Sequence, residues 1–461
     1  METANARTDR VARTRFNRGA ATILAVMTLV LPLGLSGCGS GNPTPSPSSP
    51  QANETASSPV ESAPSTAAAT PTLPPTPTPS PTPTLPPTPT PSPTPKPTPT
   101  PSPKPGSIGA SYAMVVARVY HTATLLKNGM VLIAGGENDT GVLASAELYN
   151  PSTRKFTLTG SMNQARMDHT ATLLKDGKVF VAGGVGLAGT LNSAEIYDPA
   201  TGKFTLTGAL LFARSRHTAS LLSNGTVLLA GGMDALGHAM ASAETYSETS
   251  GHTSSTGGLA KARFSHSATT MSGGKILVAG GVNNGATLYS AEVYNPSTGK
   301  FSATGSMIQG RADAAAVLMT DGRVFIAGGY AYCPGLNPVP PGHICIDTGL
   351  STAEIYSAST GKFVKTGPLD HARGAASLPL PGITLADGRI LIAGGALHDG
   401  TTLDSVELFD PVLSKFVEIG NLKYPRGGNT ATRLASGRVL ITGGYDGNVG
   451  ATRGSAELYI P

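Results

Sequence analysis

The sequence predicts an all-β fold, a seven-bladed β-propeller, and three observations support this prediction. Glycine accounts for 57 of 461 residues and charged residues for only 13%, which suits short strands joined by tight turns. A turn dipeptide such as Asp176-Gly177, an apolar run and a glycine pair follow one another seven times. Successive pairs are 48, 48, 49, 48, 66 and 49 residues apart. A repeat of this length is typical of a propeller blade. The glycine pairs are Gly135-Gly136, Gly183-Gly184, Gly231-Gly232, Gly280-Gly281, Gly328-Gly329, Gly394-Gly395 and Gly443-Gly444.

Each repeat predicts four strands. In the repeat from Ala165 to Gly208, HTATLL and VFVAGG flank Asp176-Gly177, a dipeptide that favours a tight hairpin turn. AEIY predicts a third strand, and the turn DPATG leads to a fourth at KFTLTG. An array of separate β modules is the alternative. It is disfavoured because a lone four-stranded sheet cannot bury both faces, whereas stacked blades can.

The two ends of the repeat region predict how the ring closes. The seventh repeat stops at Tyr459-Ile460-Pro461, directly after its third strand. The segment SIGASYAM, Ser107 to Met114, precedes Ala117-Arg118 just as FTLTGSM precedes Ala165-Arg166. We therefore expect this N-terminal segment to supply the outer strand of the last blade, which leaves no sheet edge unpaired.

Residues 1–37 have the composition of a signal peptide. Five arginines precede the apolar run from Ala21 to Ser36, which ends at Leu35-Ser36-Gly37-Cys38. This ending resembles the bacterial lipobox. The resemblance implies an exported protein, lipid-anchored through Cys38 to the bacterial membrane, at the cell surface or in the periplasm. A membrane-spanning anchor or a plain secretory signal is the alternative, although the run is short for a span of about 20 residues.

Residues 38–105 predict a disordered Pro/Thr/Ser-rich stalk. From Pro43 to Pro105 there are 24 prolines among 63 residues, and large apolar residues are almost absent. Such a segment cannot form a core and favours extended polyproline II. It is either a spacer that lifts a domain away from the membrane or a tether without a tuned length.

The repeat resembles the kelch repeat over Ala117–Pro461. The matching residues are the double glycine, the Glu-x-Tyr of Glu195 and Tyr197, and the aromatic residue of the fourth strand. Phenylalanine stands where kelch repeats usually carry Trp, and the chain contains no Trp. The chain is similar to the bacterial branch of galactose-oxidase-type propellers. The resemblance implies a single propeller domain over residues 106–461 that acts as a recognition platform.

Two charged residues recur in every repeat, one Arg and one Glu. Equal numbers and strict repetition favour seven structural Arg–Glu pairs. The alternative is a ring of arginines that binds an anion. The arginines are Arg118, Arg166, Arg214, Arg263, Arg311, Arg373 and Arg426. The glutamates are Glu147, Glu195, Glu244, Glu292, Glu354, Glu407 and Glu457.

The position two residues after each Arg varies and is the candidate binding site. It leads into the first strand, which lines the central channel in kelch propellers. The residues are Tyr120, Asp168, Arg216, Ser265 and Asp313, then Ala375 and Gly428. The next position holds His121, His169, His217 and His266. We expect these histidines to be spread around the ring, too far apart to share a metal ion.

Tyr120-His121 looks like the copper-ligating segment of galactose oxidases. Those enzymes also use a Cys crosslinked to a Tyr and a His from a further C-terminal domain, whereas this chain ends with the propeller. Its cysteines are Cys38, Cys333 and Cys345. We therefore expect no copper and no other cofactor.

Cys333 and Cys345 lie in the one long insertion, residues 330–350. In an exported protein, two nearby cysteines predict a disulfide. The bridged insertion is either a recognition loop or a tolerated insertion.

The charge balance argues against nucleic-acid binding, because residues 106–461 contain 26 Lys and Arg against 24 Asp and Glu. We expect a monomeric binding module for an unidentified protein or polysaccharide, in contact with the membrane only through its lipid anchor. A carbohydrate-active oxidase, lyase or epimerase on the same scaffold is the alternative. A third interpretation is a structural element of the cell envelope.

Overall fold

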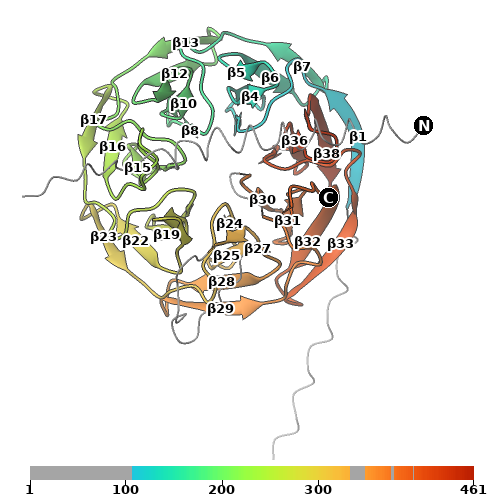
Figure 1. Cartoon of the computed structure of the whole chain (residues 1–461). Coiled ribbons are helices and arrows are strands. Elements are labelled where there is room, and N and C mark those ends of the chain that lie inside the picture. Colours follow the sequence, from blue (N-terminus) through green and yellow to red (C-terminus); the bar gives the residue numbers. More distant parts are fainter. Residues whose placement is uncertain (1–105, 333–347, 375–377, 398) are drawn as a thin grey trace, which may run out of the picture. The chain divides into compact units, whose positions relative to one another are not determined.

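The computed structural model describes residues 106–332, 348–374, 378–397 and 399–461. Seven four-stranded antiparallel sheets are arranged in a ring, as Figure 1 shows, with the first strand of each sheet nearest the central axis. The predicted seven-bladed propeller is therefore confirmed. The predicted signal peptide, Cys38 and the stalk lie outside the described residues. Within the described ranges, no helix is long and apolar enough to cross a membrane.

The blades follow one another along the chain, each ordered from the channel to the rim. Blade 1 is β2 (Thr122–Leu125), β3 (Val131–Ala134), β6 (Ala146–Asn150) and β7 (Lys155–Leu158). Blade 2 is β8 (Thr170–Leu173), β9 (Val179–Ala182), β12 (Ala194–Asp198) and β13 (Lys203–Leu206). Blade 3 is β14 (Thr218–Leu221), β15 (Val227–Ala230), β16 (Ala243–Ser247) and β17 (His252–Ser255). Blade 4 is β18 (Ser267–Thr270), β19 (Ile276–Ala279), β22 (Ala291–Asn295) and β23 (Lys300–Ala303).

The last three blades keep this order. Blade 5 is β24 (Ala315–Leu318), β25 (Val324–Ala327), β28 (Ala353–Ser357) and β29 (Lys362–Thr366). Blade 6 is β30 (Gly382–Thr384), β31 (Ile390–Ala393), β32 (Ser405–Asp410) and β33 (Lys415–Asn421). Blade 7 is β34 (Thr430–Arg433), β35 (Val439–Thr442), β38 (Ser455–Ile460) and β1 (Ser107–Ala113).

Blade 7 closes the ring as the sequence predicts. Its outer strand is the N-terminal β1, which pairs antiparallel with the C-terminal β38 from Ser107↔Ile460 to Ala113↔Ser455. The register shifts between Ile108 and Ser111. The first described strand therefore covers the edge that the C-terminal strand would otherwise expose.

The core lies between the blades. Seven hydrophobic clusters fill the seven interfaces, and each combines side chains of two neighbouring blades. At the closing interface, Val131 and Tyr149 of blade 1 pack with Leu440 and Leu458 of blade 7. Each blade thus buries both faces only because it has two neighbours, which explains why the repeats need the closed ring.

The paired glycines let neighbouring blades approach closely. A side-chain carbon on Gly135 would lie 2.5 Å from the carbonyl oxygen of Arg166 in the next blade. The backbone N–H of Gly136 donates to that same oxygen at 2.9 Å. Both glycines have positive φ, 64° and 90°, a conformation that favours glycine. The glycine pair is therefore repeated because it allows the backbones of neighbouring blades to pack closely and to form a hydrogen bond.

One end of the ring carries the beginnings of the inner strands and the short hairpins that follow the paired glycines. These hairpins are β4–β5 (Glu137–Asn138, Gly141–Val142), β10–β11 (Val185–Gly186, Gly189–Thr190), β20–β21 (Val282–Asn283, Ala286–Thr287), β26–β27 (Tyr330–Ala331, Thr348–Gly349) and β36–β37 (Tyr445–Asp446, Ala451–Thr452). We call this end the mouth. The long insertion starts from β26 and returns at β27, so its base is at the mouth. Cys333 and Cys345 lie outside the described residues.

Candidate binding site at the channel mouth

The variable position ahead of the inner strands has an unusual backbone conformation. Five successive blades place a non-glycine residue there with φ between 50° and 56°, in the left-handed region. This conformation costs an L-residue about 1–2 kcal/mol. The five residues are Tyr120, Asp168, Arg216, Ser265 and Asp313.

A belt of backbone hydrogen bonds connects these five residues around the mouth. The N–H of Asp168 donates to the carbonyl of Tyr120 at 3.3 Å, and the N–H of Arg216 donates to that of Asp168 at 3.0 Å. Ser265 and Asp313 continue the belt at 3.0 Å each. Each turn is thus locked to the turn of the preceding blade.

Four of these side chains line one pocket of about 200 Å³: Asp168, Arg216, Ser265 and Asp313, from blades 2 to 5. The structure therefore brings together most of the residues that the sequence nominated. The rest of the wall is His169, His217, His266, Ala314 and Pro379. Tyr120 and His121 are outside this lining.

Arg216 is held inside the pocket by carboxylates. Its Nε lies 3.0 Å from Oδ2 of Asp168, and the two side chains are only 9% and 11% exposed. Burial by itself lowers the pKa of Arg216, but the charges of Asp168 and Asp313 raise it above its ordinary value. The guanidinium of Arg216 is therefore always charged, and its Nε is paired with Asp168.

Two phenols and a further acid lie close to this group. Burial, followed by the charge of Asp168, raises the pKa of Tyr120 well above its ordinary value. Burial and the charge of Asp313 do the same for Tyr330. Both phenols therefore stay protonated at neutral pH and can donate hydrogen bonds. Burial and Asp168 also raise the pKa of Glu137.

Sequence reasoning missed Tyr330 and Glu137. Each directly follows a glycine pair, and its backbone bridges to the residue just before the variable position, as Val119↔Glu137 and Ala312↔Tyr330. The signal was available in the repeat, because the residue after the glycine pair varies among blades as the mouth position does.

In blade 6 the repeat spacing assigned Ala375 to the mouth position, and Ala375 lies outside the described residues. Among the described residues of this blade, Pro379 lines the pocket. The segment contains an insertion: Leu380 follows Arg373 by seven residues, whereas His169 follows Arg166 by three. Proline has no N–H, and the next residue, Leu380, donates instead to the carbonyl of Asp313 at 3.0 Å.

The same segment fills the other side of the mouth with apolar groups. Leu378 packs against Val119 and Ala396, with Tyr120 beside them. In blade 7 the mouth position is Gly428, where a side-chain carbon would lie 2.9 Å from Leu378. The mouth therefore has an apolar side at blades 6, 7 and 1 and a polar pocket at blades 2 to 5.

The four histidines bind neighbouring blades. The Nε2 of each is within hydrogen-bond distance of a threonine hydroxyl of the preceding blade, at 2.9–3.2 Å, and each ring is at most 7% exposed. The pairs are His121 with Thr430 and Thr442, His169 with Thr122, His217 with Thr170, and His266 with Thr218. Burial, then the nearby Arg166 and Arg263, lowers the pKa of His169 and of His266 to about 3. These rings are therefore neutral at pH 7.

His121, of the segment Tyr120-His121, is buried and hydrogen-bonded. His121 uses its Nε2 for two threonine hydroxyls. Among the residues that the structure describes, no three His, Cys, Asp or Glu side chains are placed to hold a metal ion. The side chains in the pocket and beside it are carboxylates, a guanidinium, a serine hydroxyl, imidazoles and phenols.

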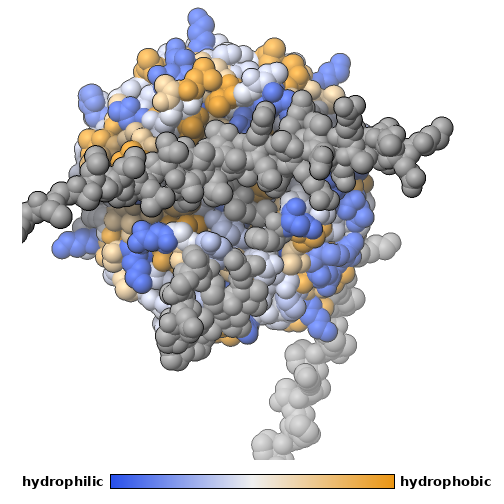
Figure 2. Space-filling view, viewed as in Figure 1, coloured by the Kyte–Doolittle hydropathy of each residue, from blue (hydrophilic) through white to orange (hydrophobic). Residues whose placement is uncertain are grey.

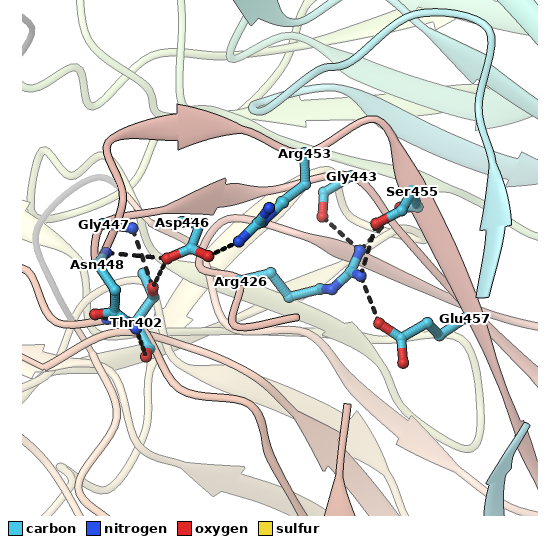
Figure 3. A network of polar contacts seen from close by, with 9 residues as sticks. All are labelled: Thr402, Arg426, Gly443, Asp446, Gly447, Asn448, Arg453, Ser455 and Glu457. Atoms are coloured by element: carbon cyan, nitrogen blue, oxygen red, sulfur yellow. Dashed lines mark hydrogen bonds and ion pairs between the residues drawn. The ribbon is translucent and has the colours of Figure 1, made fainter. Parts of the chain in front are cut away.

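The repeated Arg and Glu form ion pairs within each blade and take no part in the pocket. Each Arg is at most 1% exposed and also donates to the carbonyl of the first glycine of its pair at 2.6–2.9 Å. Figure 3 shows this arrangement for Arg426, Gly443 and Glu457. The pairs are Arg118–Glu147 (3.1 Å), Arg166–Glu195 (2.8 Å), Arg214–Glu244 (2.8 Å), Arg263–Glu292 (2.9 Å), Arg311–Glu354 (2.9 Å), Arg373–Glu407 and Arg426–Glu457 (2.7 Å).

Comparison with known proteins agrees with this architecture. A model of the Kelch motif matches residues 169–207 and 263–308, which lie in blades 2 and 4. No curated protein matches the chain. Among solved structures, a fungal alcohol oxidase of the AA5 family, in complex with copper, is similar in fold, with a TM-score of 0.61 and 17% identity. The match covers 78% of this chain and 77% of that chain. Two segments of the chain thus match the Kelch motif, and the propeller is similar in fold to that AA5 oxidase.

Proposed function

We propose that this propeller is a binding module that holds a saccharide unit in the polar pocket at its mouth. One observation supports this most strongly. Asp168, Arg216, Ser265 and Asp313 come from four different blades, all adopt an unfavourable backbone conformation, and all line one pocket. Strain of this kind, kept at a site where varied polar side chains converge, is characteristic of functional positions.

The size and polarity of the pocket favour a sugar over a larger ligand. Pockets for drug-sized molecules are commonly about 300–1,000 Å³. A pocket of about 200 Å³ has room for little more than one sugar ring. The sequence left protein and polysaccharide open, and a recessed polar pocket favours the polysaccharide.

The division of the mouth also suits a sugar. A pyranose presents hydroxyl groups at its edge and C–H groups on its face. The polar wall of blades 2 to 5 offers carboxylates and a hydroxyl to the edge. Tyr120 and the apolar cluster around Leu378 offer an amphipathic surface to the face.

The rest of the proposal concerns where the module acts. Lipidation of Cys38 would anchor the exported chain to a bacterial membrane, and the stalk would hold a monomeric propeller away from that surface. A disulfide between Cys333 and Cys345 would stabilise the insertion that begins and ends at the mouth, next to Tyr330. We infer that this insertion is a recognition loop.

Thermal unfolding of the full chain with a panel of oligosaccharides tests the proposal. A ligand that binds only the folded state raises the midpoint by mass action. The double variant Asp168→Gly, Arg216→Gly should fold, because it removes both members of the ion pair and glycine suits the backbone, but it should lose the shift. Arg154→Gly is the matched control: Arg154 also has a left-handed backbone, φ 57°, but lies in the turn between β6 and β7 at the other end of the ring. Absence of any shift with the unchanged chain would refute the proposal.

The enzymatic alternative has one observation in its favour, the presence of both Asp168 and Asp313 in the pocket. Two carboxylates can divide acid and base roles. Incubating the full chain with each oligosaccharide that shifts its midpoint, followed by mass analysis of the sugars, separates the two. A new product, lost in Asp313→Asn, would establish an enzyme; unchanged sugars support a binding module.

A further inference from the structure

The end of the ring opposite the mouth is rich in basic residues. It consists of the turns between the first and second strands and between the third and fourth strands of each blade. Of the 19 Lys and Arg of residues 106–461 outside the seven repeated ion pairs, 14 lie in these turns or at the strand residues that flank them, against six Asp and Glu. We call this end the basic face.

The lysines of the basic face are exposed and spread around the ring. The outer strand of five blades begins with an exposed lysine, and the inner turns add others, for example Lys127 and Lys175. The outer residues are Lys155, Lys203, Lys300, Lys362 and Lys415. The positive charge is therefore distributed over the whole end of the ring rather than gathered in one groove.

Most carboxylates of the basic face have partners within their own turns. Three form ion pairs with a basic residue two positions further on, and the carboxylates of Asp198 and Asp410 each accept a backbone N–H at 2.8 Å. The ion pairs are Asp176–Lys178 (3.0 Å), Asp321–Arg323 (2.6 Å) and Asp387–Arg389 (2.7 Å). The formal charge of the face is therefore clearly positive.

One turn of the basic face has an apolar tip. Val412 and Leu413, between β32 and β33, are 89% and 53% exposed. Blade 4 has Ser297-Thr298 at the same two positions, so the repeat does not require apolar residues there. Asp410 accepts both N–H groups of the tip, at 2.8 and 3.1 Å. Exposed apolar residues mark interaction sites, and basic residues around them favour an anionic membrane.

The chain enters the propeller at the basic face. Ser107, the first residue of β1, pairs with Ile460, the last residue of β38, and β38 runs from the mouth to the basic face. The 105 residues that precede Gly106 therefore join the ring at this end. An N-terminal segment attached to a membrane would bring this face, rather than the mouth, nearest to that membrane.

We propose that the basic face docks on an anionic lipid bilayer, with Val412 and Leu413 at the headgroups, so that the mouth opens away from the bilayer. This inference goes beyond saccharide binding and does not depend on it. It adds a second membrane contact to the lipid anchor expected from the sequence. The docked ring and the ring held away by an extended stalk are two positions of one tethered domain.

The chemistry of the face favours a bilayer over a nucleic acid. Each Lys or Arg near an anionic bilayer strengthens binding about fivefold. Separate lysines spread over one end of a ring can all contribute to a surface of this kind. Single-stranded nucleic acids instead bind along a basic groove with aromatic residues for stacking.

Hydrogen exchange of the full chain, followed by mass spectrometry, tests the inference because it resolves which turns a bilayer covers. The chain is mixed with vesicles of phosphatidylglycerol and phosphatidylcholine, or of phosphatidylcholine alone. On the anionic vesicles, exchange of residues 410–415 should slow at least roughly tenfold, and about 0.5 M salt should remove most of the slowing. The mouth hairpin β10–β11, whose tip Leu187 is 85% exposed, should exchange as before.

The first variant, Val412→Ser with Leu413→Thr, gives blade 6 the residues of blade 4. It should fold, because both side chains are exposed, and it should lose most of the slowing at the tip. A loss confined to this variant shows that the apolar tip contacts the lipid.

The second variant changes charge. Lys155→Glu with Lys362→Glu should abolish the slowing, and both lysines are exposed and lie across the strand pair from uncharged residues. Lys261→Glu with Lys423→Glu is the matched control, because it makes the same charge change at the mouth and should leave the slowing intact.

The outcomes decide between partners. Equal exchange of residues 410–415 on the two kinds of vesicle, or slowing that persists in both variants, overturns the inference while saccharide binding stands. Slowing at the mouth hairpin instead also overturns it, because the ring would then dock by its other end. Protection of the basic face by a DNA duplex but not by anionic vesicles would overturn the lipid partner and indicate a nucleic acid.

Discussion

At the scale of single residues, left-handed backbone positions occur at both ends of the ring but have different consequences. At the mouth, the strained residues line a pocket. In the turn between the third and fourth strands, four blades use Gly202, Gly251, Gly299 and Gly361, whereas blades 1 and 6 place Arg154 and Ser414 there. The side chains of Arg154 and Ser414 do not line the pocket, so the strained backbone of these two turns does not position a pocket residue.

Ser414→Gly should therefore stabilise the protein. Relief of the left-handed strain, φ 53°, contributes about 1–2 kcal/mol, and the greater freedom of glycine in the unfolded chain offsets about 0.4–1 kcal/mol of it. We expect a net gain of up to about 1 kcal/mol in the free energy of unfolding, measured in urea. A clear loss of stability would contradict this account of the turn.

A second prediction at this scale concerns blade 6, which lacks a tyrosine hydroxyl that four other blades use to bond the blade before them. In four interfaces a tyrosine of one blade shares a hydrogen bond with a threonine of the blade before it, at 2.8–3.0 Å. These are Tyr197–Thr159, Tyr246–Thr207, Tyr294–Thr256 and Tyr356–Thr304. Blade 6 has Phe409 at this position, and the buried Thr366 hydroxyl has no hydrogen-bond partner.

Phe409→Tyr should supply that partner and stabilise the protein by about 0.5–1.5 kcal/mol. A double-mutant cycle with Thr366→Val isolates the bond, because the tyrosine should bring no gain once the threonine hydroxyl is absent. Equal effects of Phe409→Tyr in both backgrounds would show that no such bond forms.

At the scale of elements, the sequence predicted the strands correctly, but it did not predict which side chains come together at the mouth. Four-strand blades followed from Asp-Gly turns and paired glycines, because those residues act locally. The segment around Leu378 could not be placed, because a four-residue insertion has no fixed direction without its packing partners Val119 and Ala396. Asp168 and Arg216 could be predicted as candidate site residues from sequence, because their position varies while its neighbours repeat. That the two side chains are in contact could be seen only from the arrangement of the blades in the ring.

The histidine–threonine pairs between inner strands predict an acid-sensitive stability. The pKa of His266 falls from an ordinary 6.5 to about 3 in the folded protein, through burial and the nearby Arg263. Between these values the unfolded chain binds a proton that the folded chain does not, so stability falls as pH decreases from about 6.5 toward 3. Above this range the group has no effect on the pH dependence.

The variant His266→Asn tests this prediction. Asparagine is a suitable replacement, because blade 7 has Asn429 at the same position. The free energy of unfolding, measured in urea from pH 7.5 to 5, should fall less steeply in the variant than in the unchanged protein. An identical pH dependence would mean that His266 is accessible to protons in the folded state.

At the scale of the whole molecule, the ring is closed by more than the β1–β38 pairing. The hairpin of blade 7 bonds both neighbouring blades: Thr402 of blade 6 donates to Asp446 at 3.2 Å, and Thr452 donates to Asp139 of blade 1 at 3.3 Å. Figure 3 shows Asp446 with its partners Thr402, Asn448 and Arg453.

Figure 2 shows one end of the ring, with separate apolar patches between hydrophilic residues around the rim.

Arg453 is the distinctive residue of this closure. Its position holds leucine in most other blades, for example Leu143 and Leu191, so the repeat itself does not require a charge there. The guanidinium pairs with Asp446, which is 1% exposed, and lies 4.8 Å from the centre of the Tyr424 ring. The ion pair therefore compensates a carboxylate buried between the last two blades.

Arg453→Leu should restore the repeat residue yet destabilise the ring, because it leaves the Asp446 carboxylate buried without its cation. Removing one partner of a buried ion pair costs about 3–5 kcal/mol. Because all seven blades share one closed ring, the loss should appear in urea as a lower midpoint of a single transition rather than as separate unfolding of blade 7. Arg453→Leu combined with Asp446→Asn should recover much of the stability, since the amide keeps the acceptor for Thr402 and carries no charge. A single variant as stable as the unchanged protein would show that the pair has no part in closure.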